Sequence, residues 1–291
     1  MSTQRAPLRV VTFNILPLAY TLVSQWAAQG GHQIVLVVTS PGPTSRRSSS
    51  YQGVVNSVPP GTDVLVTTRL RKVATPLIRA LAPDLIVSFS FPYLITPELC
   101  AIPRYGAVNL HPSALPSYRG PNPVRGIYEG FPLLGASLHW IAEEYDTGAI
   151  LAQHTAPLPD NVTPEAIMQL WPPLMIGAFA EGVARAVAGE PGRVQDHSQA
   201  SYGAAFTEAE HWLTPTDTRQ VLQRQCAALN LFAPAAKLQR DGQAYLVARL
   251  DPLDDTMTAA PGTISEQSEQ GFTWQVADGR VRVQATAITQ Q

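Results

Sequence analysis

The segment that decides the fold is residues 8–39, with the sequence LRVVTFNILPLAYTLVSQWAAQGGHQIVLVVT. Two apolar runs, Leu8–Phe13 and Gln33–Thr39, flank the stretch Pro17–Gln29, which starts at a proline and ends before Gly30, as helices commonly do. Apolar runs without polar alternation are typical of parallel strands that are covered on both faces. We therefore expect a strand, a helix and a second strand of a buried α/β unit.

The same segment also has features of a secretory signal, because Arg5 and Arg9 precede an uncharged run from Val10 to Ser45. Asn14 and Pro17 interrupt the apolar part of this run, however. A membrane-spanning helix needs about 18 or more apolar residues in succession. The strand–helix–strand interpretation is therefore favoured, and no membrane segment is expected.

The alternation of strands and helices continues to residue 188. The pattern predicts further strands at Val64–Thr67, Leu85–Phe89, Ala107–Leu110, Leu134–Ile141 and Ala149–His154, and helices at Val73–Leu81 and Thr163–Ala188. The stretch Pro41–Gly61, rich in Ser, Pro and Gly, is expected to lack regular structure. Such an alternation specifies the α/β class, with an open, mostly parallel, Rossmann-like sheet.

The pattern changes after residue 188. Residues 189–211 are polar and weakly periodic, which predicts a linker between an α/β domain over 1–188 and a second domain over 212–291. In the second domain the sequence predicts a helix at Thr216–Leu231 and then short strands at Ala244–Leu250, Gly262–Ser265, Phe272–Val276 and Val281–Ala287. We expect a small β-rich, barrel-like C-terminal domain.

The composition narrows the classes of function. The 291 residues carry a formal charge of −2, with 45% hydrophobic and 14% charged side chains. These values exclude a disordered chain, and they give no bulk attraction to nucleic acid or to an anionic membrane. The two cysteines, Cys100 and Cys226, cannot build a disulfide framework or a zinc site by themselves. We expect a reducing, cytoplasmic compartment and no metal.

The stretch NLHPSALPSYRG, residues 109–120, carries the candidate chemistry. Asn109 and His111 stand two apart at the carboxyl end of a predicted strand, so their side chains point to the same side, at the edge where open α/β sheets bind ligands. Asp146 follows in a turn between two apolar strands. An amide, an imidazole and a carboxylate together suit acyl transfer. The spacing alone leaves a structural histidine open as the alternative.

Three ordered motifs resemble the 10-formyltetrahydrofolate-dependent formyltransferase family, which includes methionyl-tRNA formyltransferases, glycinamide ribonucleotide transformylases and sugar N-formyltransferases. They are NLHPSALPSYRGPNP at 109–123, GASLHW at 135–140 and DTGAIL at 146–151. The resemblance implies that residues 1–188 form the catalytic domain of an enzyme that moves a formyl group from 10-formyltetrahydrofolate, as co-substrate, to an amine.

The resemblance also assigns roles to residues. It makes Asn109, His111 and Asp146 catalytic: Asn109 and a protonated His111 stabilise the oxyanion, while Asp146 keeps His111 charged and helps to move the proton of the amine. It implies a folate site formed by two loops, at Phe91, Pro92, Tyr93, Leu94, Ile95, Ile141, Ala142, Glu143 and Tyr145. The stiff, proline-rich loop after the strand is a predicted substrate loop, with Ser113, Tyr118, Arg119 and Gly120, although Tyr118 and Arg119 could instead only pin that loop. His139 is interpreted as a hydrogen-bonded structural residue, with a place in the acceptor pocket as the alternative.

This sequence departs from the methionyl-tRNA enzymes at two positions that bear on the identity of the acceptor. Asn14–Pro17 replaces their Gly-Thr-Pro turn, and Thr44–Ser50 holds only two arginines where their loop is lysine-rich. Residues 191–291 carry 8 basic and 11 acidic side chains. Because phosphate contacts need Lys or Arg, we expect a small biosynthetic amine as acceptor. Methionyl-tRNA formylation is the first alternative, and hydrolysis of the formyl folate is the second. The oligomeric state stays open.

Overall fold

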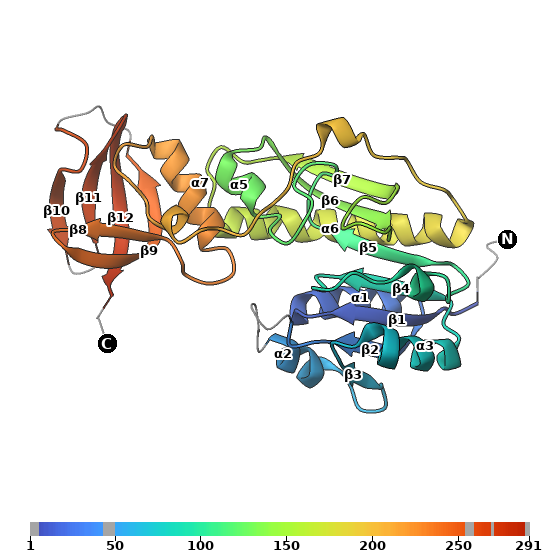
Figure 1. Ribbon diagram of the computed structural model, residues 1–291. Coiled ribbons are helices and arrows are strands. Elements are labelled where there is room, and N and C mark those ends of the chain that lie inside the picture. Colours follow the sequence, from blue (N-terminus) through green and yellow to red (C-terminus); the bar gives the residue numbers. More distant parts are fainter. Residues whose placement is uncertain (1–5, 43–49, 254–258, 269–270, 289–291) are drawn as a thin grey trace. The chain divides into compact units, whose positions relative to one another are not determined.

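A computed structural model of the chain describes residues 6–42, 50–253, 259–268 and 271–288 (Figure 1). The chain forms two compact units. The first takes in residues 1–120, 135–155 and 173–202, and the second takes in 121–134, 156–172 and 203–291. Residues 189–211, expected as a linker, therefore divide between the two units after residue 202.

The larger sheet has seven strands in the order β3-β2-β1-β4-β5-β6-β7. The strands are β1 (Arg9–Asn14), β2 (Gln33–Thr39), β3 (Val64–Val66), β4 (Leu85–Phe89), β5 (Ala107–His111), β6 (Leu133–Trp140) and β7 (Ile150–Pro157). The pairs from β3 through to β5 are parallel, and β5 pairs with β6 in the antiparallel sense. The predicted α/β class with a mostly parallel sheet is confirmed.

Alternate side chains of the parallel strands enter two different cores. Phe13 and Leu36 lie in a cluster with residues of α3 (Thr75–Leu81) and α4 (Pro97–Cys100). Val37, next to Leu36, instead packs with Tyr20 of α1 (Pro17–Gln29) and Val54 of α2 (Ser50–Ser57). Both sides of these strands are therefore buried, which explains why their sequences are continuous apolar runs.

The C-terminal part is a five-stranded sheet in the order β10-β11-β12-β9-β8, beside helix α7 (Arg219–Leu229) in Figure 1. Leu222, Cys226 and Leu229 form one face of α7 and are buried in a cluster with residues of the sheet. The strands are β8 (Lys237–Arg240), β9 (Gln243–Pro252), β10 (Ile264–Ser268), β11 (Gly271–Val276) and β12 (Gly279–Ala287). The predicted β-rich domain is confirmed, and its closure into a barrel stays a prediction.

Two further α-helices in the described part of the chain are α5 (Arg125–Glu129) and α6 (Pro164–Ala188). The hydroxyl of Thr163 accepts a hydrogen bond from the Ala166 amide and so caps α6 at the predicted start. None of the described helices is long and apolar enough to cross a membrane.

Three expectations need correction. The stretch Pro41–Gly61 is not without regular structure, because it contains α2; residues 43–49 lie outside the described part. The helix expected from Val73 begins as a π-helical turn at Leu70–Ala74 before α3. Strand β8 was not predicted, since only one of its four side chains, that of Leu238, is buried.

Candidate active site

The strand β5 and the turn after β6 bring the three predicted catalytic side chains together. Asn109 and His111 lie on β5, and Asp146 lies between β6 and β7. The Asn109 Nδ2 donates a hydrogen bond of 3.1 Å to Oδ1 of Asp146. Nδ1 of His111 lies 3.5 Å from the other carboxylate oxygen, Oδ2. One carboxylate therefore contacts both the amide and the imidazole.

A fourth side chain, His139, joins this cluster from β6. It stands opposite Asn109 in the antiparallel pair, is 2% exposed, and its Nε2 lies 3.2 Å from Asn109 Nδ2 and 3.4 Å from Asp146 Oδ1. Its Nδ1 lies 2.8 Å from the carbonyl oxygen of Trp140. A carbonyl only accepts, so Nδ1 carries a proton, and in the neutral ring Nε2 accepts from Asn109. His139 is thus both hydrogen-bonded in the structure and part of the site.

The surroundings of His111 suit its charged form. Nε2 lies 2.8 Å from the main-chain oxygen of Tyr118, which can only accept, so Nε2 carries a proton. Nδ1 faces the carboxylate of Asp146. That contact is attractive only when Nδ1 is protonated as well, because a bare ring nitrogen would repel the carboxylate.

Asp146 is held as an anion although it is only 9% exposed. Burial raises the pKa of this carboxyl, whereas the charge of His111 and the hydrogen bond from the amide of Gly120 lower it, and the net shift is downward. The Gly120 amide donates to Oδ2 over 2.8 Å. The pKa of Asp146 therefore lies well below its usual range. Its backbone is left-handed, with φ of 57°, a conformation that strains a residue other than glycine.

The predicted substrate loop contributes mainly through its main chain. Tyr118 offers its carbonyl to His111, and Gly120 its amide to Asp146. The Ser113 hydroxyl donates to the carbonyl of Ser117 and so closes the loop on itself. The Arg119 side chain is buried and bonds to Gln195 and His197. The structure thus gives Arg119 a pinning contact.

Gln195 is the site neighbour that the sequence did not suggest. It is 2% exposed, and its Nε2 donates to the carbonyls of Asp146 and Gly148 over 2.8 and 2.7 Å. The side chain lies 49 residues beyond Asp146, in the segment expected as a linker. A lone glutamine carries no signal in sequence that could have placed it here.

A match to a known family identifies the class of enzyme. Residues 11–171, more than half of the chain, match the Formyl transferase family. The chain belongs to the formyl transferase family. The predicted resemblance and the predicted class of enzyme, a formyltransferase, are both confirmed.

Relatives of this formyltransferase by sequence include methionyl-tRNA formyltransferases. That of Roseiflexus sp. (strain RS-1) is 29% identical over 275 residues, which cover 90% of this chain and 83% of the relative. That of Halorhodospira halophila is 30% identical over 216 residues, which cover 72% of this chain and 68% of the relative.

Solved structures with the same fold include sugar N-formyltransferases. WlaRD, a sugar 3N-formyl transferase, matches with a TM-score of 0.67 and 15% identity over 99% of this chain and all of its own. The N-formyltransferase from Helicobacter canadensis, in complex with folinic acid and dTDP-3-aminofucose, matches with a TM-score of 0.68 and 16% identity over 97% of this chain and all of its own. HypX from Aquifex aeolicus in complex with tetrahydrofolic acid gives a TM-score of 0.69 and 17% identity over 96% of this chain, which spans only 44% of HypX.

The two loops predicted to hold the folate lie side by side in this formyltransferase. Phe91, Tyr93 and Ile141 are half-buried and pack against one hydrophobic cluster. The Tyr145 hydroxyl donates to the carbonyl of Pro92 over 3.5 Å, and the ring is 49% exposed. Among the other predicted residues Ile95 is buried, Leu94 and Ala142 are half-buried, and Glu143 is exposed. The loops therefore form an apolar and aromatic edge with main-chain polar groups.

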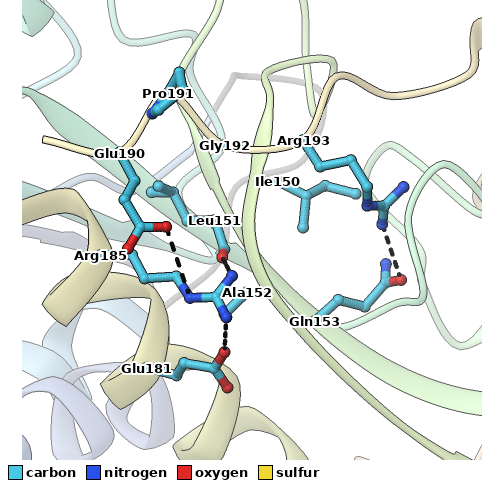
Figure 2. A pocket seen from close by; sticks show the side chains of 10 residues that line it. All are labelled: Ile150, Leu151, Ala152, Gln153, Glu181, Arg185, Glu190, Pro191, Gly192 and Arg193. Carbon is cyan, nitrogen blue, oxygen red and sulfur yellow. Dashed lines mark hydrogen bonds and ion pairs between the residues drawn. The ribbon is translucent and has the colours of Figure 1, made fainter.

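A separate hollow of about 530 Å³ lies beside β7 and the C-terminal part of α6 (Figure 2). Arg185, Glu181 and Glu190 line it, and Arg185 pairs with both carboxylates, as Figure 2 shows. None of the predicted site residues lines this hollow.

The two cysteines are not placed as a second reactive centre in the described part of the chain. Burial raises the pKa of the Cys226 thiol to about 12 and that of Cys100 to about 11, so both are poor nucleophiles at neutral pH. Within the described part of the chain, no three His, Cys, Asp or Glu side chains are placed to hold a metal ion together.

Proposed function

We propose that this formyltransferase moves the formyl group of 10-formyltetrahydrofolate to an amine of a small biosynthetic substrate. The observation that carries the proposal is the buried, ionised Asp146 in contact with both Asn109 and His111. Such a cluster offers hydrogen-bond donors and a fixed negative charge within one site, which is what acyl transfer to an amine requires.

The residues of the two predicted folate loops fit a pterin. A flat heterocycle with polar edges needs an apolar slot and main-chain donors and acceptors. Phe91, Tyr93, Ile141 and the half-exposed Tyr145 provide the apolar and aromatic part. When bound, the folate supplies an activated formyl group on a nitrogen atom.

The donors of the site are held by internal acceptors. Both hydrogens of Asn109 Nδ2 are engaged, one with Asp146 and one with His139. The Nε2 proton of His111 is engaged with the carbonyl of Tyr118. We infer that Asn109 turns its hydrogen from His139, and His111 its proton from Tyr118, toward the formyl oxygen as negative charge develops there. Catalytic hydrogen bonds commonly tighten only in the complex.

The low pKa of Asp146 indicates its part in the reaction. A carboxylate with a pKa far below neutral is a weak base, so it is poorly suited to hold a proton for long. We infer that its main work is electrostatic: it faces Nδ1 of His111 and orients the ring. The proton that the amine loses would pass by way of this carboxylate to the folate nitrogen that gives up the formyl group, and Asp146 would not retain it. The distance of 3.5 Å between Oδ2 of Asp146 and Nδ1 of His111 agrees with this electrostatic role.

The charges of the C-terminal residues favour a small acceptor over tRNA. Residues 203–291 contain 7 Lys and Arg against 10 Asp and Glu. Arg224 donates to a main-chain carbonyl. The other six basic side chains each contact a carboxylate: Arg219, Lys237, Arg240, Arg249, Arg280 and Arg282. Because phosphate binding depends on available cations, this surface offers little to a tRNA backbone. Arg46 and Arg47 lie outside the described residues.

Methionyl-tRNA is the second candidate acceptor, and a specific observation favours it. The similarity to the Roseiflexus methionyl-tRNA formyltransferase extends over 90% of this chain, and so well beyond residues 11–171. A C-terminal domain shared with tRNA enzymes is the natural place for a tRNA contact.

A single assay separates these candidates. The purified chain is given 10-formyltetrahydrofolate with a panel of amines, including amino sugars and hydroxylated ornithine, and separately with methionyl-tRNA at ~50 and ~200 mM salt. Release of tetrahydrofolate that depends on a small amine supports the proposal. Transfer to tRNA that falls steeply with salt supports the second candidate. Formate released at full rate without any acceptor would instead indicate a hydrolase.

A further inference from the structure

The side chain of Gln195 joins two loops that meet at the catalytic carboxylate. Its Nε2 donates to the carbonyl of Asp146 and to that of Gly148, over 2.8 and 2.7 Å. Its Oε1 accepts from Nε and Nη2 of Arg119, over 3.2 and 2.7 Å. Gln195 is 2% exposed and Arg119 is 9% exposed, so neither is solvated in the folded chain.

These four hydrogen bonds use the whole amide of Gln195. Two hydrogens meet two carbonyl oxygens, and the amide oxygen meets two guanidinium donors. A flipped amide would set its oxygen against the carbonyls and its hydrogens against Arg119. Only one orientation of the Gln195 amide therefore satisfies all four hydrogen bonds. The contact depends on the directions of these bonds as well as on the volume of the side chain.

The contact with Gln195 helps to determine the orientation of the Asp146 carboxylate. Asp146 has a left-handed backbone, so its peptide needs external support to keep that conformation. Gln195 holds the carbonyl of Asp146 itself, while Arg119 precedes Gly120, whose amide donates to Asp146 Oδ2. One glutamine thus fixes the backbone of the carboxylate and the loop that binds its oxygen.

The segment 195–201 also holds Tyr118, the second hydrogen-bond partner of His111. The Ser201 hydroxyl accepts from the amide of Tyr118, and the Ser201 carbonyl accepts from the amide of Arg119. The carbonyl of Tyr118 in turn binds Nε2 of His111. Both groups that flank the His111 imidazole are therefore held from residues 195–201.

We propose that Gln195, through its bonds to Arg119 and to the Asp146 peptide, is a positioning residue that aims the catalytic carboxylate at His111 and Asn109. The proposal rests on the proposed function for its kinetic consequence only. The geometric consequence, that Asp146 loses its orientation when Gln195 is replaced, does not depend on which reaction the chain catalyses.

The test replaces Gln195 by Met, which keeps the length of the side chain and removes all four hydrogen bonds. We expect kcat for formyl transfer to fall about tenfold to a hundredfold, since small misplacements of reacting groups have effects of that size. The KM for 10-formyltetrahydrofolate and the binding of 5-formyltetrahydrofolate, used as a probe of the folate site, should change by less than about threefold. Gln199→Met is the matched control, because Gln199 is exposed and bonds only to the neighbouring Asp196.

A second variant separates geometry from packing. Gln195→Glu keeps the volume and can still accept from Arg119, but it cannot donate to the two carbonyls. It should lose kcat as Gln195→Met does. In the double variant Gln195→Met with Arg119→Met the loss should be smaller than the product of the single losses, because the two residues act as a unit.

An NMR signal reports the geometry without any activity. The amide proton of Gly120 senses its bond to the charged Asp146 Oδ2, and Asp146→Asn shows where the signal moves when that charge is lost. We expect the Gly120 signal of Gln195→Met to move in the same direction, while that of Gln199→Met stays in place. If the wild-type chain formylates nothing, the proposed function fails and this signal still tests the positioning role.

Three results would overturn the proposal: full kcat in Gln195→Met or in Gln195→Glu, a Gly120 signal unchanged in Gln195→Met, or failure of both Gln195 variants to fold. The last result would make Gln195 a residue of fold stability alone. A rise in KM with kcat unchanged would count against it as well, because it would place Gln195 in binding.

Discussion

His139 stands opposite Asn109 across the β5–β6 pair, and its Nε2 lies 3.2 Å from Asn109 Nδ2. The contact depends on the antiparallel sense of the β5–β6 pair, which follows the parallel pair β4–β5. It orients the amide of Asn109, because a neutral His139 that donates to Trp140 leaves only an acceptor at Nε2.

From this contact we predict that His139→Ala lowers kcat by about tenfold to a hundredfold, with less effect on KM for the folate. Removing the ring leaves one hydrogen of Asn109 without its acceptor, and it removes one of the side chains that contact the Asp146 carboxylate. His154→Ala is the control, because His154 pairs with Glu181 at the surface of α6. Steady-state kinetics of both variants check the prediction, and equal activities would show that His139 only fills space.

Each of the three central side chains should be indispensable. We predict that Asn109→Ala, His111→Ala and Asp146→Ala each lose at least about a hundredfold in rate, the usual effect of removing one donor or charge that stabilises a transition state. Circular dichroism melts establish that the variants fold. A folded variant with near-normal turnover would remove the role assigned to that residue.

The depressed pKa of Asp146 predicts how stability depends on pH. The charged carboxylate contributes its full stability above the pKa of an unfolded Asp, near 4, and loses it as the pH falls through the lower pKa of the folded chain. The wild-type chain should therefore exceed Asp146→Asn most in free energy of unfolding at pH 5 and above. The difference should narrow as the pH falls below about 4, because the unfolded chain takes up the proton of Asp146 there while the folded chain does not. Urea unfolding at several pH values measures this, and a constant difference would contradict it.

The sequence was most informative where a residue's role depends on near neighbours. The helix Pro17–Gln29 and the strand Gln33–Thr39 have the predicted ends, because proline, glycine and apolar runs act locally. Asn109 and His111 could be placed on one side of a strand end for the same reason. Asp146 was a candidate from its turn between two apolar strands and took its role from the family resemblance, and the structure brings it into contact with both.

What the sequence could not provide depends on contacts between distant residues. Helix α2 has weak helix formers, and its Val54 is buried against Tyr20 and Val37, so tertiary packing favours it over a loop. His139 enters the site only through the register of β5 with β6. Gln195 reaches Asp146 across 49 residues, and no local pattern encodes such a contact.

The close approach of Gly120 to Tyr202 gives the last prediction. Gly120 has φ of 95°, and a Cβ built on it would lie 2.3 Å from the Tyr202 ring. Its amide also binds Asp146. We predict that Gly120→Ala costs about 1–3 kcal/mol of stability through backbone strain and lowers kcat by at least about tenfold, because the amide and the carboxylate separate.

Gly189→Ala is the control for strain alone, since Gly189 has φ of 79° and open space around its Cα. It should lose stability to a similar or smaller degree and keep its activity. Chemical unfolding and initial rates of the two variants side by side decide the matter. If Gly120→Ala were as active as Gly189→Ala, the main-chain amide of Gly120 would have no part in holding the catalytic carboxylate.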